Sequence, residues 1–267
     1  MSNIKTISIL GCGWYGLALA KYLIARKYTV KGSTTSEEKL QTLEQAGLKP
    51  YLLNFTAEEA VYDPDFFDCD VLWIAIPPKS RSGEGDSYVK KIENIAKAAK
   101  TNGVKRVVYI SSTGVYGDHN REVNELTPPE PISTSGKILL QAEDLLRNQT
   151  ASQYTIIRFG GLIGPGRNPG RFFAGKKNIP NGKAPVNLIH LDDCLSISEA
   201  ILNNDFWGHT LNACSPQHPE KSAFYTKAAE TSGLEKPEFI DELLEWKIVN
   251  SVYIEPKLHY KFKTNYL

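Results

Sequence analysis

The chain has 267 residues, of which 41% are hydrophobic and 23% charged, as in ordinary soluble globular proteins, so the composition excludes a disordered chain. Its 31 Lys and Arg residues against 30 Asp and Glu residues leave a formal charge of +1, which provides no field to attract nucleic acid or an anionic membrane. The longest apolar run, Val71 to Ile76, is far shorter than the ~18 residues of a membrane span.

We therefore expect no nucleic-acid partner and no membrane partner. The first residues lack the apolar stretch of a secretory signal, so we expect a cytoplasmic protein. The four cysteines are widely spaced and form no CxxC pair, which favours reduced thiols and predicts no metal site.

Short apolar runs alternate with amphipathic stretches along most of the chain, a pattern that predicts parallel βαβ units. In chain order, the pattern predicts strands over residues 6–10, 28–32, 51–54, 71–76, 107–111 and 154–159. It predicts helices over residues 14–26, 37–46, 88–102, 136–148 and 222–232, and one from a cap at Asp192 or Asp193 to residue 202. The predicted fold class is therefore α/β, with a Rossmann-type doubly wound parallel sheet.

A glycine-rich turn, GCGWYG, joins the first predicted strand directly to the first predicted helix. Gly11 permits a tight turn, Gly13 lets the backbone approach a pyrophosphate, and Gly16 allows close packing of helix and strand. Amides at the start of the helix would bind the phosphates. The sequence thus predicts a dinucleotide site formed by Gly11, Cys12, Gly13, Trp14, Tyr15 and Gly16. The alternative is that the glycines serve packing alone, and the rings of Trp14 and Tyr15 are expected to pack.

The end of the second predicted strand, KGSTTS, indicates which dinucleotide binds. It contains no Asp to hold the ribose 2′-hydroxyl of NAD, whereas the hydroxyls of Ser33, Thr34 and Thr35, near Lys39, suit a 2′-phosphate. This favours NADP, with NAD as the other possibility. The competing interpretation is a helix start capped by Ser36. Further cofactor contacts are expected at later strand ends, from Ala75, Pro77 and Ser111.

Three more motifs follow the glycine turn: SSTGVYG at 111–117, RFGGLIGPGR at 158–167 and NLIHLDD at 187–193. Over roughly residues 5–215, the chain resembles the extended and atypical short-chain dehydrogenase/reductases, in the NAD-dependent epimerase/dehydratase branch. Typical members have one more residue between the first two glycines. The resemblance implies a cofactor along the carboxyl ends of the strands and a small C-terminal region closing over a substrate, often a nucleotide sugar.

With this resemblance, residues 1–165 are expected to form a dinucleotide-binding domain, to which residues 186–215 return. Residues 166–185 and 216–267 are expected to form the small substrate-facing region. Residues 160–183 contain seven glycines, which is typical of either a long functional loop or a small excursion from the sheet.

The resemblance implies that Ser112 is the hydroxyl that hydrogen-bonds the reacting oxygen, although turn formation is its other possible role. Family members also carry a Tyr and a Lys four residues apart on a helix, but STSGKILLQAE at 133–143 contains no tyrosine. One register places the pair at Ser133 and Lys137, and the other at Ser135 and Leu139. Lys137 remains a candidate for the cofactor ribose or a surface lysine, and Tyr116 a candidate substitute for the missing phenol or a packed aromatic.

Three residues beyond the sixth predicted strand are candidates for substrate binding. Arg167 and Asn168 lie in a glycine-rich loop, where a guanidinium offers a planar donor pair to a phosphate or carboxylate. His190 is a candidate for orienting a substrate, with a packed histidine as the alternative.

These residues together predict an NAD(P)-dependent oxidoreductase, or an epimerase/dehydratase-like enzyme, that transfers hydride on a sugar-like or small polar substrate and that forms a possible homodimer. Loss of the tyrosine favours a second hypothesis, a dinucleotide-binding sensor or partner-binding protein without turnover.

Overall fold

The structure is a computed structural model that describes residues 4–78, 85–149 and 152–263. Its centre is a parallel sheet with the strand order β12-β9-β7-β6-β1-β2-β3. The seven strands are β1 (Thr6–Leu10), β2 (Thr29–Thr34), β3 (Lys49–Leu52), β6 (Val71–Ile74), β7 (Arg106–Ser112), β9 (Gln153–Phe159) and β12 (Thr210–Ala213). The chain builds outward from β1 to β3 and then crosses back to β6, so the order reverses between β1 and β6. The predicted Rossmann-type α/β fold is confirmed.

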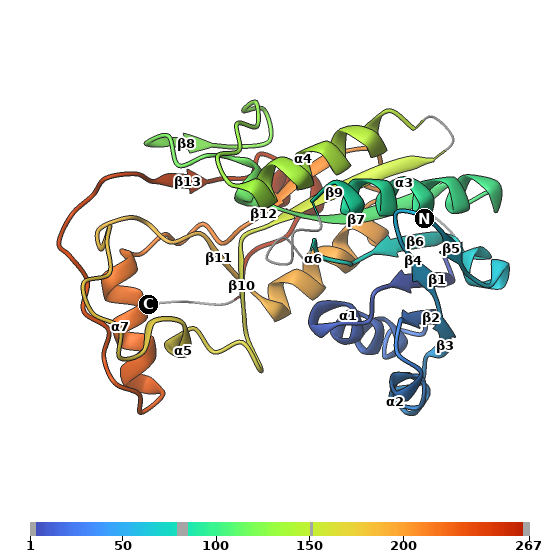
Figure 1. Cartoon of the computed structure of the whole chain (residues 1–267), viewed down its shortest axis with the longest axis horizontal. Helices are drawn as coiled ribbons and strands as arrows, with labels where there is room; N and C mark the ends of the chain where they lie inside the picture. Colours follow the sequence, from blue (N-terminus) through green and yellow to red (C-terminus); the bar gives the residue numbers. More distant parts are fainter. Residues whose placement is uncertain (1–3, 79–84, 150–151, 264–267) are drawn as a thin grey trace.

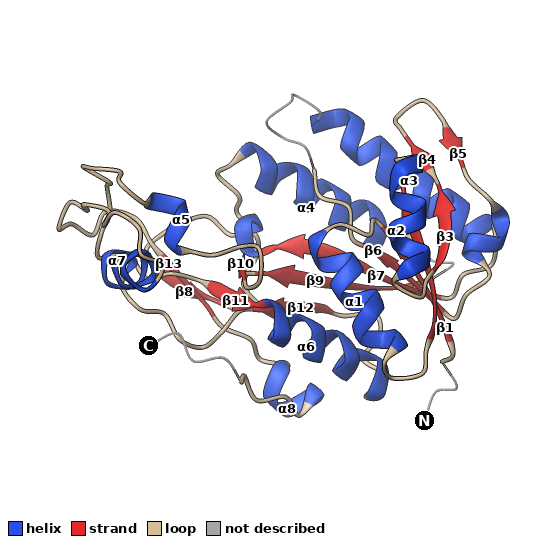
Figure 2. Cartoon of the chain, turned by 90° about the horizontal axis from the view of Figure 1, so that it is seen from below, coloured by secondary structure: helices blue, strands red, loops and turns tan. Residues whose placement is uncertain are grey.

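Helices cover both faces of this sheet (Figures 1 and 2). On one face, α1 (Trp14–Ile24) contacts α6 (Leu191–Asn203), and on the other α3 (Gly85–Thr101) contacts α4 (Thr134–Arg147). Because both faces are covered, the central strands are largely buried, and all four residues of β6 are apolar and buried.

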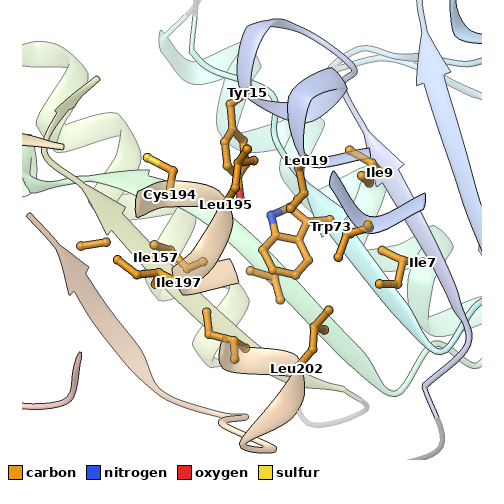
Figure 3. Close-up of a cluster of buried hydrophobic side chains, with 14 of the residues drawn as sticks. Ile7, Ile9, Tyr15, Leu19, Trp73, Ile157, Cys194, Leu195, Ile197 and Leu202 are labelled. Atoms are coloured by element: carbon orange, nitrogen blue, oxygen red, sulfur yellow. The ribbon is translucent and has the colours of Figure 1, made fainter. Parts of the chain in front are cut away.

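The layer between the sheet and α1 and α6 is a continuous apolar core (Figure 3). Trp73 of β6 is fully buried there, among Tyr15 and Leu19 of α1 and Leu195 and Leu202 of α6. This packing holds the first turn of α1 firmly against the carboxyl ends of β1 and β6.

The predicted elements are present, with shifts at their ends that have local causes. The first strand has the expected bounds, whereas the strand expected over 71–76 ends at Ile74, ahead of two prolines. The helix expected over 37–46 is divided into a 3-10 turn, η1 (Glu37–Lys39), and α2 (Leu40–Gln45). The cap expected from Asp192 or Asp193 is wrong: Nδ1 of His190 accepts the hydrogen bond from the Asp192 amide at 3.2 Å.

A smaller region lies beyond the carboxyl ends of the sheet (Figure 1). Two short parallel pairs form it, β10 (Gly161–Ile163) with β11 (Leu188–His190), and β8 (Arg121–Val123) with β13 (Lys247–Val249). Residues 160–183 include β10 and a short helix, α5 (Gly170–Phe173), which packs on α7 (Lys221–Thr231). A Cβ at Gly170 would lie 2.4 Å from the Ala228 carbonyl oxygen of α7, so this contact requires glycine.

The remaining short elements are β4 (Asn54–Phe55), β5 (Ala60–Val61), η2 (Pro64–Phe67), η4 (Thr113–Val115) and α8 (Ile254–Leu258). Within the described ranges, no helix combines the length and the apolar character needed to cross a bilayer. The same residues contain no group of three or more His, Cys, Asp or Glu side chains placed to hold a metal ion.

Candidate functional site

A cleft of about 260 Å³ opens at the carboxyl ends of β1, β6 and β7, where the strand order reverses. Ligands of open α/β sheets bind at this position. The described residues that line it come from the glycine turn, three strand ends, α4, β10 and the loop after β10: Gly13, Trp14, Tyr15, Gly16, Ala75, Ile76, Pro77, Pro78, Ile110, Ser111, Ser112, Leu139, Phe159, Gly160, Leu162 and Arg167.

The three glycines of the turn have different physical roles. Gly11 has φ +100°, and a Cβ there would lie 2.7 Å from Cγ2 of Ile76. A Cβ at Gly16 would lie 2.3 Å from the Gly11 carbonyl oxygen, so both glycines are required by packing. At Gly13, by contrast, no atom of the described residues lies within 4 Å of the added Cβ, which would project into open space at the cleft. Packing alone therefore does not explain Gly13.

The start of α1 leaves backbone donors available at the cleft. Its N-cap is Gly13, which has no side chain to cap the helix, and the Leu17 amide is the donor to the Gly13 carbonyl at 2.9 Å. The amides of Trp14, Tyr15 and Gly16 precede it, and first-turn amides have no intrahelical acceptor. Together with the open space at Gly13, these donors fit the diphosphate of a nicotinamide dinucleotide.

Cys12 and Tyr15 carry the two ionisable side chains of the glycine turn, and of these Tyr15 lines the cleft. The Tyr15 ring packs edge-on against Phe159 at 5.1 Å between centroids, and its hydroxyl is 2.7 Å from Oγ of Ser198. Burial raises the pKa of the Tyr15 phenol well above its ordinary value and that of the Cys12 thiol to about 12. Both groups therefore stay protonated at neutral pH.

The hydroxyls at the end of β2 divide into those already bonded and one that faces solvent. Oγ of the buried Ser33 accepts a hydrogen bond from the Gly11 amide at 3.0 Å, which ties β2 to the glycine turn. Oγ1 of Thr34 accepts one from the Ser36 amide at 3.1 Å. Thr35 is exposed. Ser36 stands at the N-cap of η1, but its side chain makes no capping bond within the described residues.

Ser112 ends β7 and lines the cleft, on the far side from the glycine turn. Its Oγ accepts a hydrogen bond from the Gly114 amide at 3.1 Å, so it is also a turn-forming residue. A hydroxyl that accepts one bond still has its own proton to donate. Ser112 thus fits both of the roles expected for it.

The α4 side of the cleft is apolar where the resemblance implies a lysine. Leu139 lines the cleft and is only 7% exposed, whereas Lys137 is exposed and is not among the lining residues. The structure thus favours the register that pairs Ser135 with Leu139. It places Lys137 on the outer face of the helix, as a surface lysine.

Tyr116 does not line the cleft, and its placement does not support a role as substitute for the missing phenol. The side chain is buried, and its hydroxyl donates to the Asn124 carbonyl at 2.9 Å and accepts from Nη1 of Arg158 at 2.6 Å. Burial raises the pKa of this phenol. Tyr116 is therefore a packed, hydrogen-bonded aromatic.

A buried ionic network behind the cleft wall was not expected from the sequence. Glu143 of α4 is fully buried and accepts hydrogen bonds from Ser111 Oγ at 2.6 Å and from Arg158 Nη2 at 2.6 Å. Nη2 of Arg147 adds a third contact at 2.5 Å. The sequence signal is the charged Arg158 inside an otherwise apolar strand, because a buried cation requires a buried anion. Through this network the Ser111 hydroxyl is oriented toward Glu143, and Ser111 remains one of the residues that line the cleft.

Among the substrate candidates, only Arg167 reaches the cleft. Asn168 instead contacts the end of α7, where its Nδ2 donates a hydrogen bond to Ser232 Oγ at 2.9 Å. Its Oδ1 accepts a hydrogen bond from the Gly170 amide at 2.8 Å. His190 caps α6 and is not a lining residue. Ala75 and Pro77 line the cleft as expected, together with apolar strand-end residues that the sequence analysis did not single out: Ile76, Pro78, Ile110, Phe159 and Leu162.

Comparisons with known proteins agree with this geometry. A family model described as NAD(P)H-binding matches residues 11–187. The chain is 39% identical to Protein YeeZ of Escherichia coli K12 over 245 residues, which cover 90% of this chain and 88% of that protein.

Solved structures with the same fold cover nearly the whole chain. A functionally unknown conserved protein from Silicibacter pomeroyi DSS superposes with a TM-score of 0.81 at 23% identity, covering 98% of this chain and 95% of that one. UDP-glucuronic acid 4-epimerase from Bacillus cereus, in complex with NAD, superposes with a TM-score of 0.80 at 19% identity, covering 98% and 94%. By this family model, which matches well over half of its length, the chain belongs to the NAD(P)H-binding family.

Proposed function

We propose that this protein is an NAD(P)-dependent enzyme that transfers hydride to or from a carbon bearing oxygen on a sugar-like or small polar substrate. The observation that supports it most is that one cleft joins the uncapped start of α1 to the hydroxyl of Ser112. A dinucleotide whose diphosphate is bound at Gly13 would extend toward Ser112, which stands at the end of β7, two strands from β1.

NADP is the proposed cofactor, and NAD is the alternative. The segment KGSTTS after the glycine turn offers hydroxyls and no Asp. Thr35 is exposed and Lys39 is exposed nearby, so both are accessible to a 2′-phosphate.

The proposed chemistry has three parts: hydride transfer, polarisation of the substrate oxygen, and transfer of a proton. When bound, the nicotinamide ring supplies or accepts the hydride. Ser112 donates a hydrogen bond to the substrate oxygen and polarises it. The titratable side chains among the described lining residues are Tyr15 and Arg167, and burial keeps the Tyr15 phenol protonated. The proton that the substrate oxygen gains on reduction, or loses on oxidation, is therefore proposed to be exchanged with water or with another group of the substrate.

A nucleotide sugar is the proposed class of substrate. The Bacillus cereus neighbour is a UDP-glucuronic acid 4-epimerase, and another neighbour, MoeE5, is solved in complex with UDP-glucuronic acid and NAD. The small region adjoins the cleft, because Arg167 lines it and the chain then leads into α5, which packs on α7.

One observation favours a second candidate, a dinucleotide-binding sensor without turnover. Leu139 occupies the cleft wall where the resemblance implies a lysine, and no tyrosine hydroxyl of the described residues is free there to act as an acid. Such a protein would bind the cofactor and perform no hydride transfer.

The deciding experiment measures binding and turnover separately. Calorimetry with NADPH and NADH tests the dinucleotide site, and NADPH consumption with a panel of aldehydes, ketones and nucleotide sugars tests the chemistry. Turnover that Ser112→Ala lowers by about a hundredfold, while leaving cofactor affinity unchanged, supports the enzyme. Thr101→Ala is the matched control, because it removes an exposed hydroxyl at the end of α3, outside the cleft. Tight binding without turnover supports the sensor, and the absence of binding contradicts both.

A further inference from the structure

A tight turn from the small region closes onto the glycine turn. Gly164 and Arg167 form a two-way backbone pair, in which the Arg167 amide donates to the Gly164 carbonyl at 2.8 Å. Gly164 and Gly166 have φ values of +141° and +76°, so the chain reverses sharply here. At its tip, the Pro165 carbonyl accepts a hydrogen bond from Nε1 of Trp14 at 2.7 Å, across 151 residues of sequence.

The side chain of Arg167 lies against the same indole. Its Cζ is 4.6 Å from the centroid of the Trp14 ring, which is the geometry of a cation–π contact. No carboxylate of the described residues forms an ion pair with Arg167, and it is the one charged side chain among the described residues that line the cleft. The cleft therefore holds a positive charge that no protein group neutralises within the described ranges.

The position of this charge distinguishes the two ends of the cleft. Trp14 is the first residue of α1, so its indole holds the guanidinium at the end with the uncapped amides. Ser112, at the end of β7, marks the other end. An anion placed between Arg167 and the first turn of α1 would meet a guanidinium on one side and backbone N–H groups on the other.

We propose that Arg167 binds the diphosphate of the dinucleotide, opposite the amides of α1, and that Trp14 is the residue that positions it. The proposal rests on the function proposed above, and it assigns to the cofactor a residue that the sequence alone suggested for a substrate. A diphosphate carries charge on both phosphates, whereas the helix start supplies only partial charge. A guanidinium supplies the missing full charge and can bind two oxygens at once.

The experiment compares Arg167→Gln with Arg171→Gln, a variant with the same loss of charge. Arg171 lies four residues further on, in α5, and is exposed and absent from the cleft lining. Calorimetry with ADP-ribose and with NADH gives the affinity, because both ligands carry the diphosphate and ADP-ribose lacks the nicotinamide. Arg167→Gln is expected to weaken both by about tenfold, as for the loss of one charge-assisted hydrogen bond, and Arg171→Gln is expected to change neither by more than about twofold.

Three further measurements separate the loss of a diphosphate contact from a general weakening of cofactor binding. High salt is expected to reduce the affinity of the wild type for ADP-ribose more than that of Arg167→Gln, because the variant has lost one ionic contact. Trp14→Phe retains an aromatic ring beside the guanidinium but loses the hydrogen bond to Pro165. It is therefore expected to lower the affinity for ADP-ribose by less than Arg167→Gln does. The difference in tryptophan emission between wild type and Trp14→Phe reports whether ADP-ribose disturbs the indole.

Equal affinities of wild type and Arg167→Gln for ADP-ribose would overturn the proposal and leave the proposed function intact. Wild-type protein that binds neither ADP-ribose nor NADH would overturn both. Both arginines are exposed, so thermal unfolding of each variant is expected to match that of the wild type.

Discussion

Two helices begin at or beside the cleft, and their first turns are built in opposite ways. At α1, the N-cap is Gly13, and the first-turn amides are left for a ligand. At α4, the Ser133 hydroxyl caps the helix by accepting the Gly136 amide at 3.1 Å. A capped terminus is satisfied by its own chain, so of these two helix starts it is α1 that leaves amides for the proposed diphosphate.

The glycines at these two helix starts differ in the same sense. A Cβ at Gly13 would meet no atom of the described residues within 4 Å, whereas one at Gly136 would lie 2.3 Å from the Gly114 carbonyl oxygen. Gly136 therefore lets α4 pack closely on the turn after Ser112, and α4 presents Leu139 to the cleft. The α1 end of the cleft thus retains the features of a binding site, whereas the α4 end is closely packed and apolar.

The largest effect on stability is expected at the buried ionic network beside α4. Glu143→Ala leaves the buried Arg158 without its anion, so it is expected to lower the free energy of unfolding by about 3–5 kcal/mol. Chemical denaturation measures the change. Asp144→Ala is the control: Asp144 pairs with the half-exposed Arg147 at 2.7 Å, and its loss is expected to cost less than about 1 kcal/mol. Similar losses of unfolding free energy for the two variants would show that the buried pair of Glu143 and Arg158 does not stabilise this side of the cleft.

The second prediction separates binding from stability at the start of α1. Gly13 has φ −80°, which alanine adopts without strain, so Gly13→Ala is expected to leave the melting temperature unchanged or slightly higher. The added methyl occupies space beside the proposed diphosphate, and affinity for NADH and NADPH is expected to fall by about tenfold or more. Calorimetry and thermal unfolding of the same preparation test both expectations.

Gly136→Ala is the matched substitution at the other helix, and the opposite result is expected for it. Its methyl would collide with the Gly114 carbonyl, so the protein is expected to lose stability by about 1–3 kcal/mol. If Gly13→Ala were the more destabilising of the two, the first turn of α1 would be part of the packed structure rather than an open site.

The third prediction concerns which dinucleotide binds. Thr35→Asp adds a carboxylate at an exposed position just after β2. We expect affinity for NADPH to fall by about tenfold, or about 1.4 kcal/mol, relative to NADH, because the carboxylate repels a 2′-phosphate and accepts a bond from a 2′-hydroxyl. Thr42→Asp, on the exposed side of α2, is the control with the same charge. An equal loss for both cofactors with Thr35→Asp would contradict the proposed position of the ribose.

The α1 end of the cleft was predictable from sequence because its features are local. Gly11, Gly13 and Gly16 lie within six residues, directly between β1 and α1, so order along the chain fixes their geometry. The α4 end depends on contacts between distant segments. Sequence left two registers open on α4, and only the packing of Leu139 against the cleft favours one of them. The partnership of Glu143 with Arg158 was missed because it joins a helix to a strand.

The last prediction tests that register, and the smallest effect of all is expected for Lys137→Ala. Lys137 is exposed on the outer face of α4, so Lys137→Ala is expected to change the free energy of unfolding by less than about 0.5 kcal/mol and to leave cofactor affinity unchanged. Leu139→Ala, two residues on, removes a buried side chain and is expected to cost about 2–5 kcal/mol. Denaturation and calorimetry with NADPH measure both variants. If Lys137 contacted the cofactor ribose, Lys137→Ala would instead lower the affinity for NADPH while leaving the free energy of unfolding unchanged.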